Sequence, residues 1–232
     1  MPPLPTTVEG VIDRLVAIDD ALPSHDGVAV FNRMYLTVTE RVLSALETRG
    51  MFRDPEFMAE LDVRFANLWL EAYDAVGSGR PVSKAWQPLF DHRAAKGLLP
   101  IQFALSGMNA HIEHDLPLAV IETCRSRGAT PRRTAVRADY EVVNDILASV
   151  EAEIRRWFLS DAGRLLDDHV GAVAHLVSAW NIDKARDLAW VSVDAIWAIR
   201  RLELLVDRYT AALAGTVGMV SRYLLTPFPG VR

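Results

Sequence analysis

The residues best suited to chemistry lie close together in LSGMNAHIEHDLPL, residues 105–118. This stretch contains Asn109, His111, His114 and Asp115. Residues three and four positions apart share a face of a helix, so His111 and Asp115 are predicted to stand one above the other on an otherwise apolar stripe. We expect His114 on the flank of that stripe and Asn109 on another side of the helix.

A carboxylate on an apolar stripe is costly unless it is paired or hydrogen-bonded. Three arrangements satisfy this requirement for His111 and Asp115. They can form a structural pair, or they can line a pocket as an acid–base pair, in which the carboxylate raises the pKa of the histidine and fixes its tautomer. They can also bind a divalent metal such as zinc or iron, for which imidazole and carboxylate are suitable ligands. The sequence leaves all three open.

Pro117 follows these residues directly. Proline cannot donate the backbone hydrogen bond to the carbonyl of Glu113, and its ring crowds the preceding turn. The sequence therefore predicts a kink or a short interruption of the helix over residues 113–117.

Further candidates come from other parts of the chain. A metal would need additional ligands, and His169 is predicted to point inward from an apolar stripe. Asp62 is a second inward-facing acid, Tyr35 stands close to an apolar stripe, and Arg186 lies among tryptophans that could line an apolar pocket. Asn144 resembles the metal-binding asparagine of class I terpene cyclases, but positions 148 and 152 are both alanine. That match is rejected, and Asn144 is kept only as a second-tier candidate.

Composition excludes several classes of protein. The single cysteine, Cys124, excludes an internal disulfide framework and favours a cytoplasmic location. No apolar run is long enough to span a membrane, and no secretory signal is visible. The net charge of −5 argues against nucleic-acid binding. One basic stretch could be a solvated loop or could bind an anion through its arginines, namely Arg125, Arg127, Arg132 and Arg133.

Apolar residues recur at helical spacing along almost the whole chain, and no stretch alternates as a strand does. Helix starts are predicted at polar caps, namely Thr6 or Thr7, Asp26, Asp54 and Asn181 or Asp183. The segment 183–224 is too long for one straight helix, so we expect a break within it. The sequence predicts a single all-α domain over residues 1–232, a bundle of seven to nine helices with a proline-kinked central helix.

Four segments carry a likeness to a known family: AWQPLF, PIQFALSGMNAHIEHDLPLAV, DYEVVNDIL and ARDLAWVSVDAIW. The chain resembles an uncharacterised, mainly actinobacterial family of helical domains with the motif Asn-Ala-His-Ile-x-x-Asp-Leu, here Asn109 to Leu116. The resemblance covers most of the chain and implies no established reaction. A looser likeness, through His111, Asp115 and Pro117, is to the helical zinc-dependent phospholipase C and nuclease superfamily.

These observations favour a small-molecule enzyme that performs metal-assisted hydrolysis or a related reaction on a largely apolar substrate, with His111 and Asp115 at its site. His111, Asp115 and His169 are the candidate metal ligands. Two alternatives remain: a non-catalytic helical module that binds a hydrophobic ligand or partner, and a metal-free cyclase or isomerase. The substrate and the oligomeric state do not follow from the sequence.

Overall fold

The computed structural model describes residues 2–147 and 181–227. Over these residues the chain is all-helical, as predicted, with eight α-helices and one π-helical turn in addition to a helical segment at 134–147. The named helices are α1 (Val8–Ala21), α2 (Gly27–Glu47), α3 (Pro55–Gly77), α4 (Gln87–His92), α5 (Pro100–Ala110), η1 (His111–Asp115), α6 (Leu116–Ser126), α9 (Ile182–Ile199) and α10 (Glu203–Leu224).

The polar caps that the sequence predicts are confirmed at four helix starts. Thr7, Asp26, Asp54 and Asn181 each accept a hydrogen bond from a backbone N–H in the first turn of the helix that follows. Such a bond satisfies one of the backbone donors that a helix leaves unpaired at its start. The expected break within 183–224 lies at residues 200–202, between α9 and α10.

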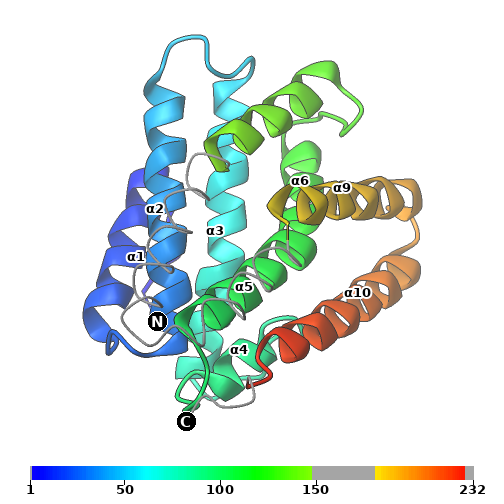
Figure 1. Ribbon diagram of the computed structural model, residues 1–232. Helices are drawn as coiled ribbons and strands as arrows, with labels where there is room; N and C mark the ends of the chain where they lie inside the picture. The colour runs from blue at the N-terminus through cyan, green and yellow to red at the C-terminus, as the bar shows by residue number, and fades with distance from the viewer. Residues whose placement is uncertain (1, 148–180, 228–232) are drawn as a thin grey trace.

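The segment α5–η1–α6 runs through the centre of the molecule. It contacts α2 and α3 on one side and α9 and α10 on the other. Figure 1 shows α1, α2 and α3 side by side, with the green α5 and α6 between them and the yellow to red helices α9 and α10. Most of the central segment is therefore buried, and its polar side chains must find partners within the protein.

The predicted interruption of the central helix is a π-helical turn, η1, at residues 111–115, so it begins two residues earlier than expected. The N–H of Leu116 donates to the carbonyl of His111, five residues back. A widened turn before Pro117 replaces the α-helical bond that the proline cannot make and relieves the crowding around its ring. Single π-turns within α-helices are frequent at functional sites.

The buried apolar side chains form two clusters. One is built from α1, α2, the second half of α3, α4, α5 and α10, and the other mainly from the start of α3, α6, the segment 134–147 and α9. Three half-buried residues, Val38, Phe65 and Met108, pack against both clusters. The boundary between the two clusters therefore passes beside η1. None of the helices in the described ranges is both long enough and apolar enough to cross a bilayer.

Two glycines on α10 differ in what surrounds them. A Cβ atom at Gly218 would lie inside van der Waals contact of the carbonyl oxygen of Lys84, whereas nothing lies within 4 Å of a Cβ atom at Gly215. Gly218 therefore allows α10 to approach the backbone of the loop before α4 closely.

Replacing Gly218 by alanine is expected to lower the free energy of unfolding by about 1–3 kcal/mol, because the backbone of Lys84 must shift. Gly215→Ala on the same helix is the matched control. It is expected to stabilise the protein by up to about 1 kcal/mol, because alanine favours helix. Urea unfolding of both variants measures the difference, and equal stabilities would contradict the close approach at Gly218.

Candidate functional site: a buried carboxylate with two histidines

Asp115 is almost fully buried, and its carboxylate accepts three N–H groups. Oδ2 accepts from Nε1 of Trp86 at 2.9 Å and from Nδ1 of His111 at 3.0 Å. Oδ1 accepts from Nδ1 of His114 at 2.6 Å. The π-turn allows both histidines to reach the same carboxylate, and Trp86 approaches it from the loop before α4. Three charge-assisted hydrogen bonds offset the cost of burying this charge.

His111 is held on all sides. Its ring stacks on Phe65, with the ring centroids 3.6 Å apart, and meets the ring of Tyr35 edge to face at 4.5 Å. Because Nδ1 donates to Asp115, the lone pair of the neutral imidazole is on Nε2. Nε2 is buried and has no hydrogen-bond partner among the described residues. The ring is therefore fixed in one tautomer with its basic nitrogen available.

Burial and hydrogen bonding act in opposite directions on this pair. Burial lowers the pKa of His111 below its usual value, although Asp115 opposes the change. Burial alone would raise the pKa of Asp115, but hydrogen bonds from His111 and His114 bring it below its usual value. At neutral pH a neutral His111 therefore donates to an ionised Asp115.

A cavity of about 100 Å³ adjoins His111. Its walls come from α2, α3, the central segment, residues 134–147 and the start of α9, and are mostly aliphatic or aromatic. Val38, Phe65 and Met108 line it, so it lies where the two core clusters meet. His111 is part of the wall, whereas Asp115 is not. The two residues thus have different positions: His111 borders the cavity, and Asp115 is joined to it only through His111.

Two of the second-tier candidates, Asp62 and Tyr35, line the same cavity. Oδ2 of Asp62 and the hydroxyl of Tyr35 are buried without a hydrogen-bond partner among the described residues. Burial raises the pKa of Asp62 to about 7. Burial and the nearby Asp62 raise the pKa of Tyr35 well above its usual value. The cavity wall therefore carries a carboxyl group that can exchange a proton near neutral pH and a hydroxyl that stays protonated.

Arg186 and Asn144, also second-tier candidates, contact each other beside this cavity. Nε of Arg186 donates to Oδ1 of Asn144, and Nη2 donates to the carbonyl of Tyr140 at 2.6 Å. The guanidinium lies 3.9 Å from the centroid of the Tyr140 ring, and the Tyr140 hydroxyl donates to the carbonyl of Arg186. Arg186 and Tyr140 line the cavity, so Asn144 reaches it only through Arg186.

The remaining candidates of the central helix face elsewhere. Nε2 of His114 lies 3.4 Å from Oγ of Ser83 and borders a separate, more polar groove. Asn109 donates to the carbonyl of Val217 and to Oγ of Ser221, which joins the central helix to α10. Asn109 is thus a packing contact, whereas His114 links Asp115 to the protein surface.

The candidate metal set of His111, Asp115 and His169 is described only in part, because His169 lies outside the described residues. Both oxygens of Asp115 already accept N–H groups, and one of these comes from His111. The two residues bind each other, which leaves Nε2 of His111 as the group of this pair best placed for a metal. Within residues 2–147 and 181–227, no three His, Cys, Asp or Glu side chains converge in a metal-binding arrangement.

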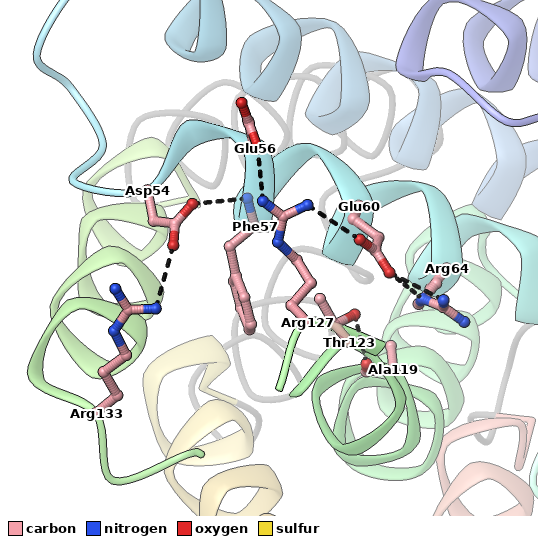
Figure 2. A network of polar contacts seen from close by, with 9 residues as sticks. All are labelled: Asp54, Glu56, Phe57, Glu60, Arg64, Ala119, Thr123, Arg127 and Arg133. Atoms are coloured by element: carbon pink, nitrogen blue, oxygen red, sulfur yellow. Dashed lines mark hydrogen bonds and ion pairs between the residues drawn. The ribbon is translucent and has the colours of Figure 1, made fainter. Parts of the chain in front are cut away.

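The arginines considered as an anion site are largely engaged within the protein. Figure 2 shows Arg127 between Glu56 and Glu60 of α3, and Arg133 beside Asp54. Nη2 of Arg127 lies 2.7 Å from Oε2 of Glu56, and Nη1 lies 3.4 Å from Oε2 of Glu60. Arg125 donates to the carbonyl of Arg200. The ion pairs join the residues after α6 to the first turns of α3, where acidic side chains also favour the helix start.

Comparison with known proteins assigns the chain to a family. Residues 8–227 match a family of unknown function. The chain belongs to the DUF5995 family. The resemblance noted in the sequence is thereby confirmed at the level of the family, while the hallmark motif and the actinobacterial distribution stay predictions. No curated protein and no solved structure matched the chain.

Three residues of this DUF5995 site were not anticipated as site residues. Trp86 donates to Asp115, Phe65 stacks on His111, and Tyr140 holds Arg186. All three are aromatic residues within apolar helical patterns, so sequence reasoning treats them as core. Trp86 carried a weak signal, because a buried tryptophan usually finds an acceptor for its N–H. Cys124 is buried as a free thiol whose pKa is raised by burial to about 11, so it is poorly suited to nucleophilic chemistry.

Asp62→Asn is expected to change how stability depends on pH. The folded state holds the Asp62 proton up to about pH 7, whereas an unfolded aspartate loses it near pH 4. Wild-type stability therefore falls as pH rises through this interval, and Asp62→Asn should remove about 3 kcal/mol of that fall between pH 5 and pH 8. Urea unfolding at both pH values measures it. The exposed Asp91→Asn is the control, and a variant that keeps the wild-type pH dependence would contradict the raised pKa.

Asp115→Asn is expected to lower the free energy of unfolding by about 1–3 kcal/mol, because three N–H donors then face a group with only one good acceptor. Asp91→Asn again serves as the control, since a surface substitution changes stability by less than about 0.5 kcal/mol. Chemical denaturation at pH 7 compares the two. Similar stabilities for both variants would argue against the three-donor arrangement.

Proposed function

We propose that this protein catalyses proton transfer on a small, largely apolar molecule, as in an isomerisation. His111 is the general base, Asp115 orients it, and Asp62 is the general acid. One observation carries the proposal: Asp115 fixes the imidazole of His111 in a single tautomer, Nε2 has no hydrogen-bond partner among the described residues, and the residue lines an apolar cavity. A base held in this way by a carboxylate is the arrangement used for proton abstraction in many unrelated enzymes.

In the proposed reaction, Nε2 of His111 accepts a proton from a carbon atom of the substrate. The imidazolium that forms keeps its Nδ1–H on Asp115, whose negative charge stabilises it. The protonated carboxyl group of Asp62 donates a proton to another atom of the substrate. The pKa of Asp62, about 7, suits donation near neutral pH. The two groups are then restored by returning a proton from His111 to Asp62 through solvent.

The apolar walls support this chemistry in a second way. Charge that develops on a substrate inside the cavity is poorly screened, so the interactions with His111 and Asp62 are stronger than they would be in water. A cavity of about 100 Å³ also limits the substrate to a small molecule. The arginine segment after α6 has no part in the proposal, because three of its four arginines, Arg125, Arg127 and Arg133, bind acids or a carbonyl of the protein itself.

Metal-assisted hydrolysis is the second candidate. It is favoured by two atoms that have no hydrogen-bond partner among the described residues, Nε2 of His111 and Oδ2 of Asp62. Both residues line the same cavity, and both atoms are of a type that binds zinc or iron. Elemental analysis of the purified protein separates the two candidates. About one equivalent of metal in the wild type, and its loss in His111→Gln, would support hydrolysis over metal-free proton transfer.

Deuterium incorporation from D₂O into a panel of small enolisable and unsaturated compounds, followed by NMR, tests the proposal. Glutamine can donate to Asp115 but cannot act as a base at neutral pH. His111→Gln is therefore expected to slow exchange by a factor of about 10²–10⁴. The exposed loop variant His25→Gln is the control and should exchange at the wild-type rate. Equal rates in the wild type and His111→Gln across the panel, including the absence of exchange in both, would contradict the proposal.

A further inference from the structure

Arg186 is a cation buried in the wall of the His111 cavity. The residue is only 4% exposed. Asn144 and the backbone carbonyl of Tyr140 accept its described hydrogen bonds, and the Tyr140 ring lies against its guanidinium. These contacts fix the direction of the side chain. They use two of the five N–H groups that a guanidinium offers.

The contacts of Arg186 with described residues are all to uncharged groups. No carboxylate of the described residues lies within ion-pairing distance, 4 Å, of its guanidinium. This includes the carboxyl group of Asp62, which lines the same cavity. Burial lowers the pKa of Arg186 below its usual value, although Tyr140 and the more distant carboxylates of Glu141 and Asp183 act in the opposite direction. An arginine remains charged at neutral pH. A buried charge is costly unless it is paired. The site therefore favours the entry of an anion.

The surroundings specify the kind of anion. Among the lining residues Arg186 is the only lysine or arginine, and His111 is neutral at neutral pH. A single buried cation balances one negative charge, which disfavours a phosphate dianion. A guanidinium binds the two oxygens of a planar carboxylate in a fork. Apart from Arg186, Asp62, His111 and the tyrosines, the lining residues are apolar, which favours a ligand with a short hydrocarbon part.

We propose that the cavity binds a short apolar carboxylic acid in its ionised form, with its carboxylate on Arg186 and its hydrocarbon part against the aliphatic and aromatic walls. The inference rests on the proposed function in that it names the substrate class for the same cavity. Binding requires no proton transfer, however, so the two can fail separately. A ligand anchored in this way would have its hydrocarbon part in the cavity that His111 and Asp62 line.

Isothermal titration calorimetry of the full chain with hexanoate, hexanol and hexylamine tests the charge preference. The three probes share a six-carbon chain and differ in the head group. Wild-type protein is expected to bind hexanoate about 10- to 100-fold more tightly than hexanol, as is typical of hydrogen bonds to a charged group. Equal or tighter binding of hexanol, no binding of hexanoate, or a preference for hexylamine would each overturn the proposal.

Arg186→Gln tests which residue provides the preference. The variant is expected to lose most of the advantage of hexanoate over hexanol, while hexanol binding stays close to that of the wild type. Arg186→Lys should retain part of the preference, because it keeps the charge but loses the fork. Arg33→Gln is the matched control, since Arg33 pairs with Asp19 away from the cavity. An unchanged preference in Arg186→Gln would overturn the assignment.

Two further measurements keep the result interpretable. Thermal unfolding establishes that each variant is folded, and if Arg186→Gln is not, the head-group comparison on the wild type together with Arg186→Lys decides. Hexanoate binding and deuterium exchange are both measured on the wild-type protein. Hexanoate binding without any deuterium exchange would support the carboxylate site and contradict only the proton-transfer function.

Discussion

The arrangement around the central helix depends on one buried charge, the carboxylate of Asp115. A carboxylate in the core is tolerated only when its lone pairs are occupied, and here three N–H groups occupy them. Two of the donors lie on the same π-turn, and the third is Trp86 in the loop before α4. The need of Asp115 for hydrogen-bond donors therefore fixes the position of the loop before α4 relative to the π-turn.

This requirement also determines what His111 can do. Asp115 uses the Nδ1–H of His111, and Phe65 and Tyr35 hold the plane of its ring, so the other nitrogen has a fixed direction. The cavity lies where the two core clusters meet, whereas most of a protein core is closely packed. A fixed basic nitrogen and an incompletely filled apolar space thus occur side by side. This combination is what separates the site from an ordinary buried His–Asp pair.

Burying the polar groups of the cavity costs free energy. These groups come from three separate helices. Asp62 on α3, Tyr35 on α2 and Arg186 on α9 are all buried. Burial raises the pKa of Asp62 and Tyr35 and lowers that of Arg186, which in each case favours the neutral form. Protein cores contain few such groups unless they are paired or used. Their convergence on one cavity, together with His111, supports the proposed binding and catalytic role.

The sequence by itself determined the helical class, four of the polar caps, the break between α9 and α10 and the presence of an interruption beside Pro117. These are local properties, because periodicity, caps and proline act over a few neighbouring residues. It also brought His111 and Asp115 together, since their spacing alone places them on one face. The tertiary structure decided that the interruption is a π-turn, that Trp86 completes the carboxylate's partners, and that Asp62, Tyr35 and Arg186 share a cavity with His111. Those contacts join residues that are distant in the chain, and they depend on how helices pack, which no local pattern encodes.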